Sequence, residues 1–276
     1  MRKDFENNLD PAGQVDVFDE LPLWSAPFGL KLLEYVDYKP DISVLDIGFG
    51  SGFPLTELAM RLGDTAVVYG IDPWKEMLER VRKKIKYYEI SNIRLIEGVA
   101  EDVPLNDSSI DLITSNNGIN NVNDIEKVLS ECERLMKPGG QFIQTMNTDK
   151  SMFEFYRQLE NVFADLGMYK EIKSMYQHIE TKRPPVKAMI AMLQKHGFIV
   201  KDLEYGQFNY KFANATAMFN HYFIRLAFME SWIKLVPKDK TEEIFGLVEL
   251  RMNGQAKQFG GLKLSIPFVV INAVKV

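Results

Sequence analysis

The chain has 276 residues, of which 46% are hydrophobic and 26% charged, proportions that are typical of an ordinary globular protein. Its 33 basic and 38 acidic residues give a net charge of −5, which argues against a general nucleic-acid-binding or anionic-membrane surface. Cys132 is the only cysteine, so an intrachain disulfide and any metal centre built from several thiolates are excluded. We expect no metal site.

The apolar segments of the chain are short. The longest nearly unbroken apolar run covers residues 265–274 and cannot cross a bilayer. The first residues lack the apolar core of a secretory signal. We therefore expect a cytoplasmic protein without a membrane span.

Residues 42–146 alternate between apolar runs of strand length and amphipathic segments of helix length. The pattern predicts strands over residues 43–47, 66–72, 92–98, 109–115 and 141–146. It predicts helices over residues 54–62, 75–88 and 124–136, and Pro138-Gly139-Gly140 ends the last of them. This alternation predicts a parallel sheet with helices on both faces.

The pattern changes after residue 150. Helices are predicted over 151–167 and 185–196, and two more strands over 197–208 and 261–276. The residues from 214 to 259, between those strands, are rich in aromatic side chains and mostly helical in pattern. A segment of this length between two strands is commonly a cap rather than a connection. The N-terminal residues 18–36 are apolar enough to pack on the body and are predicted to include one helix.

The stretch VLDIGFGSG, residues 44–52, ends the first predicted strand with glycines at alternate positions, Gly48, Gly50 and Gly52. A dinucleotide fingerprint would place its third glycine where this chain has Phe53. Glycines at this turn permit positive φ angles and let a ligand lie against bare backbone. The carboxyl end of such a strand is where open α/β sheets bind nucleoside-like ligands.

Polar residues follow the next strands as well. Asp72 ends the second strand, about twenty residues on, where a carboxylate can accept hydrogen bonds from ribose hydroxyls. It is also placed to cap the helix that starts near Trp74, and the two roles are compatible. Residues 97–102 offer amides and carboxylates beside a purine, and Asn116 lies at the end of the fourth strand.

These residues resemble the class I S-adenosylmethionine-dependent methyltransferases, of the small-molecule, methyltransferase type 11-like kind, over roughly residues 40–150. The resemblance implies an α/β fold: a Rossmann-like, doubly wound, mostly parallel seven-stranded sheet with an antiparallel last strand and a helical cap insert. Residues 137–140 match the loop before the fifth strand in that family. The resemblance implies S-adenosyl-L-methionine as the cofactor, bound by Asp46, Gly48, Gly50, Gly52, Asp72, Trp74, Ala100, Glu101 and Asn116.

Several of these residues have a second interpretation. Trp74 either flanks the adenine or packs in the core, and Glu101 either contacts the ligand or is a solvated loop carboxylate. The side chain of Asn116 either meets the methionine portion or only shapes a turn. Many relatives carry aspartate where this chain has Val99, so the contact to the adenine falls here to Glu101, to the backbone, or to neither.

We expect one methyltransferase domain over residues 1–276, with an N-terminal cap segment at 1–40, a cofactor-binding core at 41–150 and a helical insert at 213–260 over the acceptor site. The loop after the fourth strand lacks the Asn/Asp-Pro-Pro-aromatic signature typical of enzymes that methylate nucleic-acid or protein amide nitrogens. The insert offers an apolar lining in Phe219, Tyr222, Phe223, Phe228 and Trp232. A small organic acceptor is therefore expected, and a nucleic acid is not.

Methyl transfer from a sulfonium is an in-line displacement in which the protein mainly supplies alignment, desolvation and sometimes a base. His221, in the insert, is the candidate base, with a packing histidine as the alternative. His196 precedes Gly197 at a predicted helix end, which favours a structural role. Two other functions remain open: a non-catalytic module that binds S-adenosylmethionine and, less favoured by the glycine spacing, an NAD-dependent oxidoreductase. The sequence leaves the acceptor atom and the oligomeric state open.

Overall fold

A computed structural model describes residues 22–276. The described residues divide into two compact units. The first unit comprises residues 22–147, 184–206 and 268–276, and the second comprises residues 148–183 and 207–267. Residues 1–21, which include most of the predicted N-terminal cap segment, lie outside the described residues.

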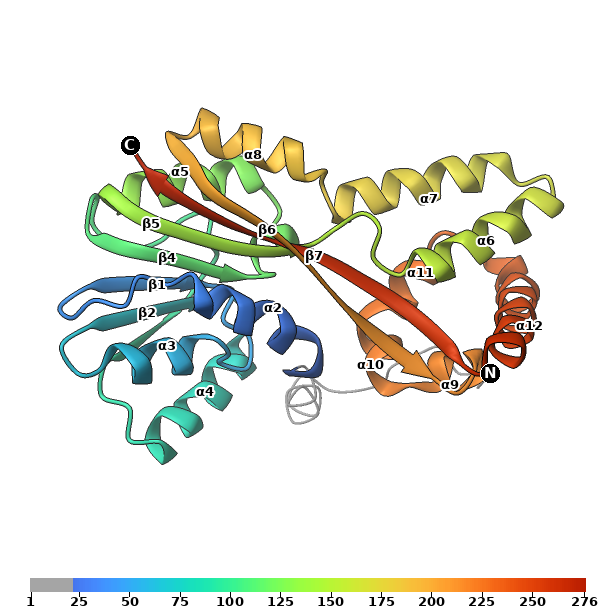
Figure 1. The fold of residues 1–276 in the computed structure, drawn as a ribbon, viewed down its shortest axis with the longest axis horizontal. Helices are drawn as coiled ribbons and strands as arrows, with labels where there is room; N and C mark the ends of the chain where they lie inside the picture. Colours follow the sequence, from blue (N-terminus) through green and yellow to red (C-terminus); the bar gives the residue numbers. More distant parts are fainter. Residues whose placement is uncertain (1–21) are drawn as a thin grey trace. The chain divides into compact units, whose positions relative to one another are not determined.

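The sheet has seven strands in the order β3-β2-β1-β4-β5-β7-β6 (Figure 1). The strands are β1 (Ser43–Ile47), β2 (Val67–Asp72), β3 (Ile93–Glu97), β4 (Ile110–Asn116), β5 (Met136–Asn147), β6 (Phe198–Phe212) and β7 (Leu262–Lys275). Strands β1 to β5 pair in parallel, and β7 runs antiparallel to β5. The predicted mostly parallel seven-stranded sheet with an antiparallel last strand is confirmed.

The helices of the first unit are α2 (Pro22–Glu34), α3 (Leu55–Leu62), α4 (Lys75–Tyr87), α5 (Ile125–Leu135) and α8 (Val186–Lys195), with a 3-10 turn η2 (Ile119–Asn121). Side chains alternate across β2, so Ile71 and Gly70 face opposite sides of the sheet. Ile71 belongs to the cluster that α5 and α8 cover. A methyl group on Gly70 would lie 2.7 Å from Leu55 of α3. Helices therefore pack on both faces, as predicted.

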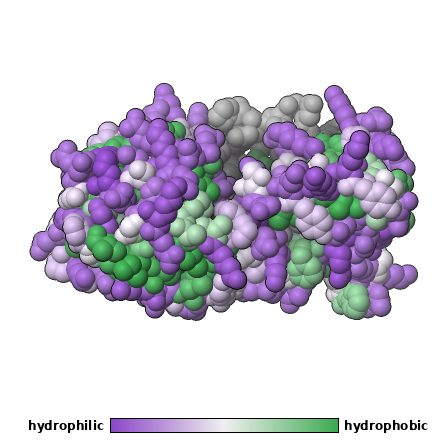
Figure 2. Space-filling view, turned by 90° about the horizontal axis from the view of Figure 1, so that it is seen from above, coloured by the Kyte–Doolittle hydropathy of each residue, from purple (hydrophilic) through white to green (hydrophobic). Residues whose placement is uncertain are grey.

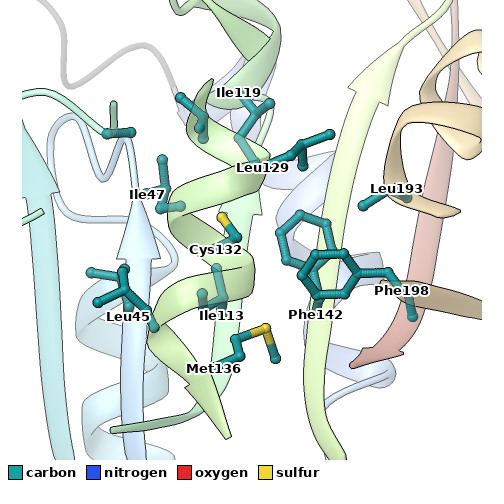
Figure 3. Packing of buried hydrophobic residues seen from close by; sticks show 14 of the residues in the cluster. Leu45, Ile47, Ile113, Ile119, Leu129, Cys132, Met136, Phe142, Leu193 and Phe198 are labelled. Carbon is teal, nitrogen blue, oxygen red and sulfur yellow. The ribbon is translucent and has the colours of Figure 1, made fainter. Parts of the chain in front are cut away.

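The core of this unit is apolar and closely packed. Figure 3 shows Leu45 and Ile113 of the sheet beside Leu129 and Cys132 of α5. Cys132 is buried, and burial raises the pKa of its thiol well above the usual range. This agrees with its interpretation as a small apolar core residue.

Strand β5 differs from its prediction. It begins at Met136, which pairs with Ile110, whereas the next pair joins Leu112 to Gln141. The segment 137–140 therefore forms an irregular bulge at the start of β5. The prediction of a loop before the strand is wrong at these residues. A bulge inserts extra residues on one strand and leaves them unpaired. Gly139 adopts the positive φ angle, +76°, that the backbone takes in this bulge.

The second unit is mostly helical, which confirms the helical pattern over 214–259. Its helices are α6 (Phe153–Asp165), α7 (Tyr169–Lys182), α9 (Ala215–Asn220), α10 (Tyr222–Ile224), a π turn (Arg225–Met229), α11 (Glu230–Ile233), a 3-10 turn (Lys238–Lys240) and α12 (Thr241–Phe259). Helix α7 was not predicted. The rings of Phe155 and Trp232 stack with centroids 3.8 Å apart, and the indole N–H of Trp232 donates to the Tyr156 hydroxyl at 3.1 Å. Phe219 and Trp232 of the insert are buried and pack against Phe155 of α6, so they form part of the unit's own core.

Hydrophilic residues cover most of the face seen in Figure 2, with smaller hydrophobic areas between them. Within residues 22–276, no helix combines the length and the apolar character needed to cross a membrane.

Candidate functional site

A cavity of about 520 Å³ opens at the carboxyl ends of the central strands in the first unit. Its lining comes from the ends of β1, β2, β3 and β4 and the turns after them, residues 47–51 and 53, 71–74, 98–101, 116–118 and 121–123. Trp24 and Ser25 of α2 complete the lining. A concave site of this size can hold a small molecule or cofactor.

The glycine-rich turn after β1 presents bare backbone to this cavity. Gly50 lines it with φ +51°, and a Cβ built there would meet no protein atom within 4 Å. Gly48, with φ +73°, donates its N–H to the carbonyl of Ile71 at 2.9 Å. Gly52 has a different role, because a methyl group there would lie 3.1 Å from Val81 of α4. It shapes the turn and does not line the cavity.

Asp72 connects the turns after β1 and β2. Its Oδ2 accepts the backbone N–H of Gly50 at 2.9 Å, and its Oδ1 accepts that of Trp74 at 2.9 Å. Burial raises the pKa of this carboxyl, and the two backbone hydrogen bonds oppose the rise. Asp72 was predicted to cap α4, but the N-cap is Trp74, and no side chain among the described residues caps that helix. Both Asp72 and Trp74 line the cavity.

Asp46 lies behind the turn and does not line the cavity, although it was predicted to contact the ligand. It is buried in β1, where its Oδ1 accepts the hydroxyl of Thr114 on β4 at 2.7 Å. Its Oδ2 has no hydrogen-bond partner within the described part of the chain. Burial raises the pKa of the Asp46 carboxyl to about 7, and the charge of Asp72 adds to the rise.

Asn116, at the end of β4, lines the cavity and holds two neighbouring elements. Its side-chain amide donates to the carbonyl of Ser25 at 3.1 Å, and its Oδ1 accepts the hydroxyl of Thr145 at 2.8 Å. Helix α2 passes close by: a Cβ on Gly29 would lie 2.2 Å from the ring of Phe53 and 2.9 Å from the Asn116 amide nitrogen. Asn116 therefore has a defined structural role beside any ligand contact.

The turn after β3 is joined to the start of α5. Glu101 accepts the backbone N–H groups of Asn123 and Asp124 through its Oε1, at 3.1 and 3.3 Å. Ala100 and Glu101 line the cavity together with Val99, whose side chain is exposed. Glu101 is thus fixed by the backbone across from it, and is not a free loop carboxylate.

The family model and the relatives that match this chain agree with one another. Residues 45–144 match the family described as methyltransferase domain. The chain is 29% identical over 210 residues to the demethylmenaquinone methyltransferase of Bacillus licheniformis, covering 73% of this chain and 87% of that one. It is 27% identical over 208 residues to the demethylmenaquinone methyltransferase of Lactococcus lactis, covering 72% of this chain and 80% of that one. Over residues 45–144 this chain carries a methyltransferase domain, and the relatives that it resembles over most of its length are methyltransferases.

A solved structure shares the fold of this methyltransferase. The YcgJ protein of Bacillus subtilis superimposes with a TM-score of 0.58 over 91% of this chain and 98% of its own, at 19% identity. S-adenosylmethionine is the cofactor of the family.

The cavity of the methyltransferase fits this cofactor. Open space beside Gly50 leaves room for a ligand against the backbone, and the Asp72 carboxylate is oriented toward the same space by two backbone amides. Asp46, which is buried behind the turn, joins β1 to β4 through Thr114 and does not line this space.

No histidine is among the described residues that line the cavity. His221 lies between α9 and α10 in the second unit, with its ring centroid 5.4 Å from that of Phe212, and it is not among the described residues that line the cavity. Its Nδ1 is buried and has no hydrogen-bond partner among residues 22–276. His196 directly follows α8 and its Nε2 lies 2.7 Å from Glu126, in agreement with a structural role.

Sequence reasoning missed several lining residues, above all Ser25 and Phe53. Both reach the cavity through the packing of α2 on the glycine-rich turn, a contact between segments more than twenty residues apart. The one signal for it was Gly29, a glycine inside a helical pattern, which often marks a close approach.

Proposed function

We propose that the cavity holds S-adenosylmethionine with its ribose at Asp72, its adenine beside residues 99–101 and Trp74, and its methionine portion along Gly48, Gly50 and Asn116. The observation that carries this placement is the bond between Gly50 and Asp72, because it sets a buried acceptor and a bare backbone side by side. Asp46 and Gly52 support the same site from behind.

The bound cofactor would supply a methyl group already activated on a sulfonium. The task of the chain is then to align an acceptor with that methyl group and to exclude water. Trp24, Phe49 and Phe53 in the cavity lining are suited to excluding water. His221 remains our candidate for removing the acceptor's proton.

We propose that the acceptor is a small organic molecule with an apolar body. The aromatic side chains of the lining support this, as do the names of the two relatives, which are demethylmenaquinone methyltransferases. We further propose that the chain acts as a single methyltransferase domain, in the cytoplasm, without nucleic acid as a substrate.

Calorimetric titration with S-adenosylmethionine and with S-adenosylhomocysteine tests the cofactor placement. We expect micromolar binding of both by the wild-type protein and markedly weaker binding by Asp72→Ala. Equal binding by the two proteins would remove the ribose from Asp72.

The acceptor is tested by release of S-adenosylhomocysteine with a panel that includes a demethylmenaquinol analogue, small phenols and RNA. Turnover with an apolar small molecule supports the proposal, and turnover with RNA alone contradicts it. Tight cofactor binding without turnover on any acceptor would favour the non-catalytic module.

A further inference from the structure

Gly118, which follows β4, lies directly against the glycine-rich turn. A Cβ built on Gly118 would be 2.5 Å from the carbonyl oxygen of Ile47 and 2.8 Å from the hydroxyl oxygen of Ser115. The contact is mutual, because a Cβ on Gly48 would be 3.2 Å from the Cα of Gly118. Backbone therefore touches backbone where β1 and β4 end.

The conformation of Gly118 does not itself require glycine. Its φ of −88° and ψ of −54° lie in the right-handed helical region, which any residue adopts. The space alone excludes a side chain, because the nearest atom is a main-chain carbonyl that cannot rotate away. Close approach of two backbones is one of the uses of glycine.

The loop around Gly118 is fixed on its other side. Asn117 donates its N–H to the carbonyl of Thr145 at 3.1 Å and accepts the N–H of Asn147 at 3.2 Å, so β5 holds the loop from behind. Ser115 joins the two sides: its hydroxyl donates to the Ile47 carbonyl at 3.1 Å and accepts the N–H of Ile119 at 3.0 Å. An added methyl group must therefore displace the peptide between residues 47 and 48.

That peptide leads directly into the turn that receives the cofactor. Two residues after Gly48, the N–H of Gly50 holds the Asp72 carboxylate. We propose that Gly118 and Ser115 are positioning residues, which set the place of the glycine-rich turn and hence the affinity for the cofactor. This inference rests on the proposed placement of the cofactor.

The test compares Gly118→Ala and Ser115→Ala with the wild-type protein. For Gly118→Ala we expect the Kd for S-adenosylmethionine to rise at least tenfold, about 1.4 kcal/mol. In the ligand-free protein we expect faster amide hydrogen exchange over residues 48–52, while β5 exchanges as before. Ser115→Ala adds no volume but removes the hydrogen bond between Ser115 and the Ile47 carbonyl. We therefore expect a smaller rise in the Kd, about threefold, which corresponds to the low end of the free energy lost with one hydrogen bond. Gly246→Ala, on α12 with no atom within 4 Å of the new methyl group, is the matched control and is expected to bind as the wild type does.

The outcomes separate the two proposals. If the wild-type protein binds no cofactor but amide exchange over 48–52 still accelerates in Gly118→Ala, the cofactor placement is wrong. The role of Gly118 in positioning the glycine-rich turn is then supported. If Gly118→Ala binds and exchanges as the wild type does, the positioning role is refuted. Should Gly118→Ala not fold, unchanged affinity and exchange in Ser115→Ala refute it equally.

Discussion

The backbone N–H of Gly50 donates to Oδ2 of Asp72 at 2.9 Å, so the turn after β1 and the end of β2 are held together by one carboxylate. The other oxygen of that carboxylate accepts the backbone N–H of Trp74, the residue just before α4. A side chain held at both oxygens loses little rotational freedom when a ligand binds, and such preorganisation favours affinity. This arrangement underlies the first prediction.

Replacement of Asp72 by alanine is expected to weaken S-adenosylmethionine binding by about 1–3 kcal/mol, because the ribose hydroxyls and the Gly50 amide would lose their acceptor. Titration calorimetry measures the change. Asp239→Ala, an exposed position in the second unit, is the control and is expected to bind normally. Unchanged affinity in Asp72→Ala would count against the proposed ribose contact.

Replacement of Gly29 by alanine is expected to destabilise the protein by about 1–3 kcal/mol, although alanine is the better helix former. The new methyl group would overlap the ring of Phe53 and crowd the amide of Asn116. The same change at Gly246 of α12 meets no atom within 4 Å and is expected to stabilise the protein by up to about 1 kcal/mol. Urea unfolding measures both, and effects of the same sign would show that α2 does not pack as described.

The raised pKa of the Asp46 carboxyl leads us to expect that the stability of the protein falls as the pH rises. Its pKa rises from 3.8 in the unfolded reference to about 7 in the folded protein, so the folded state retains a proton that the unfolded state releases. The free energy of unfolding contributed by this group should therefore fall as the pH rises from about 4 to about 7 and then level off, by at most about 1.4 kcal/mol per pH unit.

The variant Asp46→Asn should lack this slope, because an amide does not titrate. Chemical denaturation at intervals between pH 4 and pH 8 measures it, and Asp239→Asn should keep the slope of the wild type. An identical pH profile in Asp46→Asn and the wild-type protein would contradict the raised pKa.

For His221→Ala we expect kcat to fall by about 10²- to 10⁴-fold, the usual contribution of a general base, with the affinity for S-adenosylmethionine retained. Steady-state kinetics with an accepted substrate and calorimetry measure the two effects separately. His178→Ala, on α7 of the same unit, is the matched control. A fully active His221→Ala enzyme would leave His221 as a packing residue beside Phe212.

Much of the fold was readable from local pattern. The period of the apolar residues places β1 over Ser43–Ile47 as predicted and the other central elements, apart from the start of β5, within one or two residues. Burial on a sheet or a helix face repeats every two or 3.6 residues, which makes these elements readable. The glycine spacing and Asp72 likewise predict a ligand site at the carboxyl ends of the strands, since the positions of these ends follow from chain order alone.

Tertiary structure decided which of these residues face the cavity. Asp46 and Gly52 belong to the same motif as Gly50, yet one is buried beside Thr114 and the other packs on Val81. Nothing in the sequence marked Gly118 as the glycine that meets the Ile47 carbonyl, and Gly29 indicated a close approach without showing that Phe53 is its partner. These contacts join residues from 24 to 71 positions apart, and their distances are fixed only when the sheet, its turns and its helices pack together. The sequence by itself determined the strands of the sheet and predicted the strand ends where we propose that the cofactor binds, because both depend on local pattern and chain order. Packing alone decided which residues line the cavity and which support it from behind. A contact such as that of Gly118 with the Ile47 carbonyl depends on two segments that meet only in the folded protein, so neither segment predicts it by itself.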